Sequence, residues 1–241
     1  MNDLDKYLEA YEGNIQYDFD NEILLNWYPR RILEFSKTTD SLLELGLGHG
    51  YSSNIFSNFF RRHVVLEGSH AIIKNFQNKY PGCTSEIVET FFEDFNNDEK
   101  FDVVVMGFIL EHVNDPVEIL MHFRKYLTPV NGNMFISVPN AEVLNRRLGH
   151  IAGMLPDILT MSENDVLLGH KRYYTIDTLK KDIKEAGYEI IRIEGIYLKP
   201  FTSKQILSLD LDNRILNALC IVGIDYPELS CGILVQIKPI L

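Results

Sequence analysis

The sequence predicts an α/β fold in which short apolar strands alternate with helices around a mostly parallel sheet. Strand-like and helix-like segments alternate between residues 41 and 187, a pattern typical of βαβ units. Residues 101–107 (FDVVVMG) form an apolar run of the kind that is buried on both faces of a parallel sheet. With 241 residues, 46% of them hydrophobic, the chain can bury a sizeable core. We therefore expect residues 1–241 to form one domain, with inserted segments.

The expected strands are short apolar runs bounded by turn residues. Five of them precede residue 140 and two follow residue 187. They cover about 41–46, 63–67, part of 83–88, 101–107, 133–138, 188–198 and 231–238.

Helices are expected between the strands because helix-start and helix-stop signals stand there. The first, over 20–37, contains Pro29, which predicts a kink or a break. The others run over 51–60, from a cap at Ser69, from the Asp115-Pro116 start to before Pro129, and from a cap at Thr175 to Gly187.

Two segments interrupt this alternation. Residues 140–172 contain no obvious strand, and we expect them to form a lid above the carboxyl edge of the sheet. Residues 201–229 separate the last two strands and are partly helical. A connection of this length is unusual within a strand pair, so we expect a second lid lobe or an oligomer surface there.

Composition narrows the classes of partner. The net charge is −11 and Lys or Arg residues cluster in pairs at most, which disfavours a nucleic-acid partner and favours a small-molecule substrate. Three scattered cysteines argue for a reducing compartment and against a structural zinc site. An acidic, polar N-terminus and the absence of a long apolar run predict a cytoplasmic protein without a membrane span. The oligomeric state stays open, and a homodimer is possible.

The most informative stretch is 42–53 (LLELGLGHGYSS), where an apolar strand enters a turn with glycines at alternate positions. Glycine is required where the backbone takes positive φ or where a ligand lies against bare backbone. The helix that follows offers unpaired N–H groups to an anion or a ribose. A dinucleotide fingerprint would need a glycine where Tyr51 stands, so the spacing disfavours NAD.

This pattern, E-x-G-x-G-x-G, resembles motif I of the class I S-adenosylmethionine (SAM)-dependent methyltransferases. The resemblance implies a Rossmann-like seven-stranded sheet with helices on both faces and an antiparallel last strand. It also implies SAM as cofactor and S-adenosylhomocysteine (SAH) as product. The residues expected to hold the methionine part of the cofactor are Glu44, Gly46, Gly48, Gly50 and Ser52.

A second signal is the predicted strand 63–67, which ends in Glu67-Gly68. Glu67 lies 21 residues after Gly46, close to the interval at which an acidic side chain meets the ribose hydroxyls of a βαβ nucleotide site. One carboxylate can accept from both vicinal hydroxyls. Glu67 and Gly68 are therefore expected cofactor contacts, although the same pairing would also serve NAD.

Two further segments follow strands and extend the resemblance. Phe92 and Glu93 match the pair that lies around the adenine in the family, although Phe91 stands where an aspartate is common. After the fourth strand, residues 106–113 (MGFILEHV) resemble motif IV, and the Glu-His-Val sequence is typical of small-molecule methyltransferases of the quinone-biosynthesis and sugar-modifying types. The resemblance places Met106, Gly107 and Phe108 at the cofactor and His112 near the reacting groups.

Residues 169–175 (GHKRYYT) are similar to a segment that precedes the next helix in many relatives. His170, Arg172, Tyr173 and Tyr174 would give a polar, aromatic wall for a hydroxylated or anionic substrate. Packing of the tyrosines within the lid is an equally good interpretation. Asn140, directly after the fifth strand, is a candidate substrate contact by position, and Tyr17 is a weaker candidate for closing over the cofactor.

The sequence thus predicts a SAM-dependent methyltransferase that acts on a hydroxyl of a small polar metabolite, such as a sugar. His112 or His170 would remove the acceptor proton, because imidazole titrates near neutrality. No metal is predicted, since no His or carboxylate set has ligand spacing. N-methylation of a small amine, an NAD-dependent oxidoreductase and a non-catalytic relative of the fold are the alternatives.

Overall fold

The computed structural model describes residues 15–240, and it describes the side chains of these residues except at 15–17 and 163–164. Seven strands form one sheet in the order β3-β2-β1-β4-β5-β7-β6. The strands are β1 (Ser41–Leu45), β2 (Arg62–Glu67), β3 (Glu86–Glu89), β4 (Val103–Gly107), β5 (Asn133–Pro139), β6 (Tyr188–Leu198) and β7 (Ser230–Pro239).

All pairs among β1 to β5 are parallel, whereas β7 is antiparallel to both β5 and β6. The predicted seven-stranded, mostly parallel sheet with an antiparallel last strand is confirmed. The strand order reverses between β1 and β4, because the chain runs outward through β2 and β3 before it returns to the other side of β1. Such a switch point opens a crevice at the carboxyl ends of the strands.

Each central strand is apolar on both faces, which is why it is buried between two helix layers. Leu43, Val64 and Val104 belong to the core on one face, and Leu42 and Val105 to the core on the other. The helices are α1 (Ile15–Glu34), α2 (Tyr51–Ser57), α3 (His70–Lys79), α4 (Pro116–Arg124), α5 (Leu144–Ile151), α6 (Glu163–Leu167), α7 (Ile176–Glu185), α8 (Ser203–Ser208) and α9 (Asn213–Gly223).

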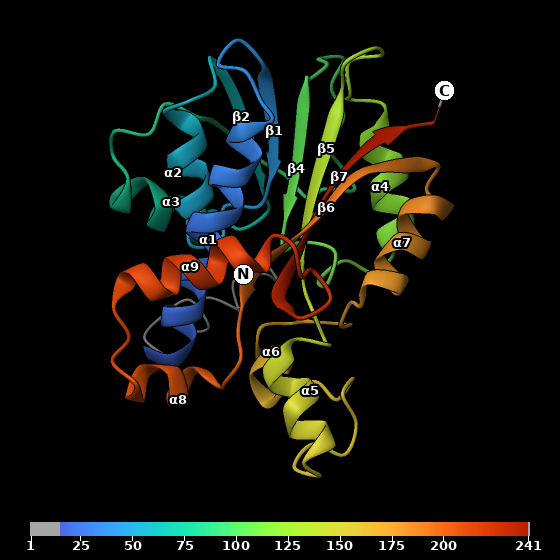
Figure 1. Cartoon of the computed structure of the whole chain (residues 1–241). Helices are drawn as coiled ribbons and strands as arrows, with labels where there is room; N and C mark the ends of the chain where they lie inside the picture. Colours follow the sequence, from blue (N-terminus) through green and yellow to red (C-terminus); the bar gives the residue numbers. More distant parts are fainter. Residues whose placement is uncertain (1–14, 241) are drawn as a thin grey trace.

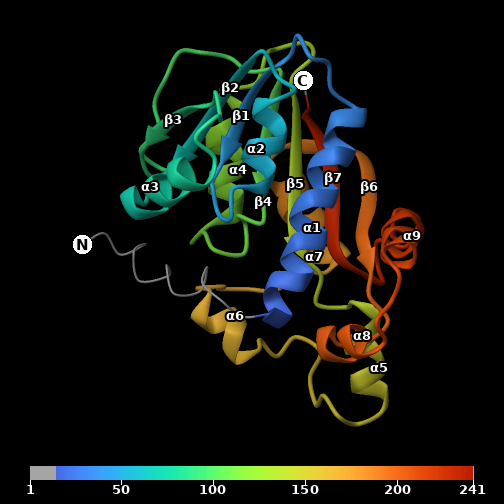
Figure 2. The ribbon, with the colours of Figure 1, turned by 90° about the vertical axis from the view of Figure 1, so that its left-hand side faces the viewer.

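The helices cover both faces of the sheet, as predicted. In Figure 1, α1, α2 and α3 lie on one side of the strands and α4 and α7 on the other. Figure 2 shows α1 running along the sheet, with α9 beside β6. Predicted caps at Ser69, Asp115 and Thr175 are confirmed, because each side chain accepts a hydrogen bond from a first-turn backbone N–H.

Two helix boundaries differ from the prediction. Within the described residues, helix α1 spans Ile15–Glu34 and continues through Pro29, so the predicted break is wrong. Helix α2 ends at Ser57 instead of residue 60, because the chain turns there through bonds from Asn58 N to Ile55 O and from Phe59 N to Phe56 O.

In Figure 1, α5, α6 and α8 of the two inserted segments lie at the lower end, beyond the carboxyl ends of the parallel strands, whereas α9 lies at mid-height and packs beside β6. Residues 140–172 carry α5 and α6, and residues 201–229 carry α8 and α9. Their bases are joined, because Leu144 N donates to Leu229 O at 3.0 Å and Asn145 N donates to Lys199 O at 3.1 Å. Within residues 15–240, no helix combines the length and the apolar character needed to cross a membrane.

Asn140 closes the base of the first insertion and does not line the cavity described below. Its backbone forms an isolated parallel bridge with Tyr174. Its buried amide nitrogen donates to the carbonyl oxygens of Pro227, Glu228 and Ser230 at 3.2, 3.2 and 2.9 Å. The predicted direct substrate contact at Asn140 is therefore not supported, since the side chain is used to hold the two insertions together.

We expect Asn140→Asp to lower the unfolding free energy by about 3 kcal/mol, because a carboxylate would replace a buried donor opposite three carbonyls. Denaturant unfolding measures the change, and Asn131→Asp, at an exposed turn residue, is the matched control. Equal stability of the two variants would contradict the assigned role of Asn140.

Candidate functional site

A cavity of about 470 Å³ lies at the switch point between β1 and β4. Its walls come from the turn after β1, the ends of β2 and β4, α1 and the insertion that carries α6. Of the residues predicted for the site, those that line it are Gly46, Gly48, Gly50, Ser52, Glu67, Gly68, Phe92, Glu93, Gly107, Phe108, His112 and His170.

The three glycines of the turn serve different purposes, although all have positive φ. A Cβ on Gly50 would lie 2.5 Å from the Phe76 ring, and one on Gly46 would lie 2.8 Å from Ile109. A Cβ on Gly48 would meet nothing within 4 Å. Gly46 and Gly50 are thus required by packing and backbone conformation, whereas Gly48 presents bare backbone to open space, where a ligand can approach.

Glu44 lies behind this turn and does not line the cavity. The carboxylate is buried and accepts from Ser52 Oγ at 2.5 Å and from Ser53 Oγ at 2.7 Å, while His63 Nε2 lies 3.1 Å away. Glu44 therefore ties β1 to the start of α2 and to β2. Its predicted direct cofactor contact is not supported, and its structural effect is to fix the shape of the glycine turn.

Glu67 lies at the end of β2 with its carboxylate in the cavity wall. Its two oxygens accept from Leu47 N at 3.0 Å and from Ser69 N at 2.8 Å. Burial raises the pKa of the Glu67 carboxyl, and the backbone N–H groups oppose that shift. The Gly68 backbone N–H also donates to this carboxylate. Three of its roughly four acceptor sites are thus used within the protein, and one is left for a hydroxyl group of a ligand.

Phe92 and Glu93 lie on the loop after β3 and contribute to the same wall, as does Thr90. The Phe92 ring is half-buried beside Gly46. Met106, in contrast, is fully buried in the sheet, so its side chain supports the wall without lining it.

The turn after β4 is shaped by Tyr28 of α1. A Cβ on Gly107 would lie 2.2 Å from the Tyr28 hydroxyl, so only glycine fits there. The next residue, Phe108, has φ of +58°, a conformation that is costly for a bulky side chain. Tyr28 and Phe108 pack edge to face with ring centroids 5.7 Å apart. This strained turn aims the following Glu111-His112 pair into the cavity.

Glu111, His112 and His170 form a compact cluster on the cavity wall. One potential ligand atom from each lies within 4.8 Å of those of the other two, and the two imidazole rings meet edge to face at 4.7 Å. His112 also donates to the Gly169 carbonyl. The spacing along the chain did not predict this grouping, because His170 lies 58 residues after His112. The cluster can surround one hydroxyl group or one divalent cation.

Burial dominates the electrostatics of this cluster. It raises the pKa of Glu111 to about 8, and neither carboxylate oxygen accepts a hydrogen bond from another of the described residues. Burial together with the neighbouring His170 lowers the pKa of His112 to about 4. The pKa of His170 is also lowered by burial, but Asp165 opposes the shift. Near neutral pH both imidazoles are therefore uncharged proton acceptors.

Arg172, Tyr173 and Tyr174 lie outside the cavity, so their predicted substrate contacts are not supported. Arg172 donates to the carbonyl oxygens of Leu110, Val113 and Asn114 at 2.6–2.9 Å. The Tyr173 hydroxyl donates to Asp165, and the buried Tyr174 donates to Asp182. Arg172 thus holds the lid against the turn after β4, whereas Tyr173 bonds within the insertion and Tyr174 bonds to α7. The Tyr17 side chain lies outside the described residues.

Sequence reasoning missed several residues that line the cavity, among them Asn21, Tyr28, Glu111 and Asp165. Asn21 and Tyr28 carry no motif, because only the packing of α1 over the turns brings them there. Glu111 was visible within the Glu-His-Val sequence, and its burial is the property that the sequence did not reveal. Asp165 was visible only as an acidic residue four positions before Gly169.

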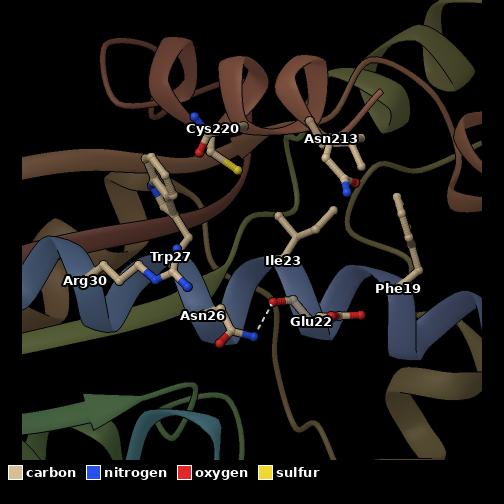
Figure 3. Close-up of a pocket in the computed structure, with 10 residues that line it drawn as sticks. Phe19, Glu22, Ile23, Asn26, Trp27, Arg30, Asn213 and Cys220 are labelled. Atoms are coloured by element: carbon tan, nitrogen blue, oxygen red, sulfur yellow. Dashed lines mark hydrogen bonds between the residues drawn. The ribbon is translucent and has the colours of Figure 1, made fainter. Parts of the chain in front are cut away.

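A second hollow, of about 360 Å³, lies between α1 and α9. Figure 3 shows Ile23 and Trp27 of α1 pointing toward α9, which carries Asn213 and Cys220. The described residues that line it include no histidine. It marks where the second insertion packs on α1, separate from the cavity.

Comparison with known proteins identifies the family. A family model described as a methyltransferase domain matches residues 19–193, more than half of the chain. A ubiquinone biosynthesis O-methyltransferase from Parvibaculum lavamentivorans is 29% identical over 119 residues, which are 47% of this chain and 44% of that protein. The chain thus aligns with less than half the length of this curated relative.

Solved structures share the fold at low sequence identity. A SAM-dependent methyltransferase from Clostridium acetobutylicum superposes with a TM-score of 0.61 at 13% identity, covering 99% of both chains. The magnesium protoporphyrin IX methyltransferase of Synechocystis PCC 6803, solved with bound SAH, gives a TM-score of 0.60 at 11% identity over 98% of this chain and 94% of that one. With its family match, its glycine turn and its sheet order, the chain belongs to the SAM-dependent class I methyltransferases.

Proposed function

We propose that this protein methylates a hydroxyl group of a small polar molecule, with SAM as the methyl donor. The observation that carries the proposal is the position of the Glu111-His112-His170 cluster, which lines the same cavity as the glycine turn and Glu67. A cofactor site and a proton-accepting group thus share one enclosed space. That arrangement is what methyl transfer to a hydroxyl requires.

The residues at the cofactor end fit SAM. Gly48 leaves backbone open to the amino-acid part of the ligand, and the Glu67 carboxylate in the cavity wall can accept from a ribose hydroxyl. Phe92 and Glu93 give the adenine an aromatic face and a polar neighbour. When bound, SAM supplies a methyl carbon made electrophilic by the adjoining sulfonium, and SAH remains after its transfer.

At the other end of the cavity, His170 is the better candidate for the general base. His112 has a pKa of about 4 and already donates to the Gly169 carbonyl, so it is a weak base held in a structural bond. His170 lies beside Asp165, which favours its protonated form. His170 would take the proton of the acceptor hydroxyl as that oxygen bonds to the methyl carbon, and bound SAM would supply the methyl group and be left as SAH with the electron pair of the broken bond.

The class of molecule that accepts the methyl group is proposed from the names of the relatives and from the groups at this end of the cavity. The matched relatives are named for ubiquinone biosynthesis, so phenolic hydroxyls belong in the first screen together with sugar hydroxyls. Small amines are the second candidate class, because the buried Glu111 carboxyl can accept a hydrogen bond from an amine N–H. The rate at which SAH forms from SAM in the presence of a phenol, a sugar or a small amine tests the three classes of acceptor. We further propose that the insertions at 140–172 and 201–229 form the substrate lobe of one domain.

Gly48→Ala should weaken SAM binding at least tenfold, because the new methyl group would point into the open space that the ligand would fill. The loss of stability should be modest, since the methyl group meets no protein atom and the cost is that of an alanine at φ of +48°. Gly50→Ala should lower stability more strongly, because its methyl group would lie 2.5 Å from Phe76. Titration calorimetry and thermal melts separate the two effects. Unchanged SAM affinity in Gly48→Ala would place the cofactor elsewhere.

Glu67→Gln should raise the Kd for SAM by about tenfold to a hundredfold, as expected for loss of a charged acceptor worth about 1.5–3 kcal/mol. Wild-type affinity should increase as the pH rises through the raised pKa of Glu67, because the charged carboxylate is a stronger hydrogen-bond acceptor than the protonated carboxyl group. Glu89→Gln, at the register partner of Glu67 on β3, is the matched control. A flat pH profile in the wild type would contradict the assignment.

His170→Gln should lower kcat about a hundredfold or more without changing SAM affinity, because general-base catalysis contributes about 10²–10⁴-fold. His112→Gln should cost about tenfold, and His150→Gln, an exposed change in the same insertion, should cost little. Full activity of the His112→Gln/His170→Gln double variant would refute the base assignment. Loss of activity on chelation, restored by a divalent cation, would instead favour a metal-assisted mechanism.

A further inference from the structure

Helix α6 is five residues long, and both of its ends are held by Asp165. At the N-terminal end, Ser162 Oγ accepts from Asp165 N at 3.2 Å, while the Asp165 carboxylate accepts from Ser162 N at 2.8 Å. This reciprocal pair is a capping box, in which the first and fourth residues satisfy each other's backbone donors. These hydrogen bonds fix the Asp165 side chain independently of the groups that line the cavity.

At the C-terminal end, α6 closes in a Schellman motif. Gly169 has φ of +78°, its N–H donates to Val166 O at 3.0 Å, and His170 N donates to Asp165 O at 2.9 Å. In this motif the residue after the glycine lies against the residue five positions before it. The backbone turn therefore places His170 beside Asp165, where many proteins have a hydrophobic contact.

The two side chains meet at the edge of the cavity. Asp165 Oδ1 lies 3.4 Å from His170 Nδ1, and both side chains are mostly buried, at 17% and 9% exposure. The other carboxylate oxygen, Oδ2, accepts from Ser162 and from the Tyr173 hydroxyl. Oδ1 is thus the oxygen left for the imidazole, at a distance that can tighten when substrate is bound.

Other charged or titratable groups face the pair from the surrounding elements. His112 packs against the His170 ring, Glu111 adjoins both histidines, and Lys171 follows His170 in the chain. Arg146 of α5 lies over the Tyr173 ring at 4.9 Å. Asp165 is the group among them that lies within ion-pair distance of the His170 ring.

We propose that Asp165 is a positioning residue, which holds His170 as the Nδ1–H tautomer so that Nε2 accepts the proton of the acceptor hydroxyl. The inference rests on the proposed O-methyl transfer and adds that the first insertion supplies the base together with the group that orients it. The proton on Nδ1 stays between His170 and Asp165, and the proton from the hydroxyl goes to Nε2. A carboxylate that fixes an imidazole tautomer in this way has large effects on turnover in other enzymes.

Asp165→Asn tests the proposal, because the amide can donate to Nδ1 and favour the wrong tautomer. We expect kcat to fall about tenfold to a thousandfold with the KM for SAM unchanged. Combined with His170→Gln, the change should cost nothing further, because the two side chains act as one unit. Additive losses in the double variant would overturn the proposal.

Two measurements guard against a purely structural effect. Ser162→Ala removes the two bonds that the Ser162 hydroxyl makes with Asp165, one to its backbone N–H and one to its carboxylate. Ser162 N and the Tyr173 hydroxyl still donate to that carboxylate, so kcat should fall clearly less than in Asp165→Asn. A loss equal to that of Asp165→Asn would show that folding of α6, and not the carboxylate, matters.

The ¹⁵N shifts of the His170 ring, assigned by comparison with His170→Gln, report the tautomer without any turnover. We expect Nδ1–H in the wild type and a shift toward Nε2–H in Asp165→Asn. An unchanged tautomer would refute the positioning role even if methyl transfer occurs. If the tautomer changes as expected but the protein transfers no methyl group, the contact between Asp165 and His170 stands and the proposed function is wrong.

Discussion

The set of hydrogen bonds to the buried Glu44 carboxylate is the interaction on which the glycine-turn end of the cavity depends. It joins β1 to two serines at the start of α2 and to His63 on β2. A buried charge is costly unless its hydrogen bonds are satisfied, and here the partners are the elements that flank the glycine turn. The carboxylate therefore fixes the turn in a shape that leaves Gly48 open to a ligand.

The opposite end of the cavity is assembled by the insertion at residues 140–172. Arg172 binds three carbonyl oxygens of the turn after β4, and Asn140 binds three from the base of the second insertion. Turns of irregular backbone expose carbonyl groups that need donors. Side chains that supply several donors at once hold such turns in place, and they bring His112 and His170 into contact.

Much of the fold and half of the site were predictable from local signals. Glycine spacing, the strand-end Glu67 and the caps at Ser69, Asp115 and Thr175 depend on residues close in sequence, and the structure places each as expected. Arg172, Tyr173, Tyr174 and Asn140 were correctly placed near the lid, but the direction of each side chain was not predictable. A polar residue next to a cavity can satisfy backbone groups as readily as it can bind a substrate.

The sequence alone determined the sheet, the family resemblance and the position of the glycine turn, because these depend on periodicity and on turn chemistry that a short segment specifies. Tertiary structure decided which ionisable groups share the cavity. Glu111, Asp165 and His170 meet only because the insertion folds back over the turn after β4. Their chemistry depends on burial and on neighbours distant in the chain, and a sequence pattern contains neither.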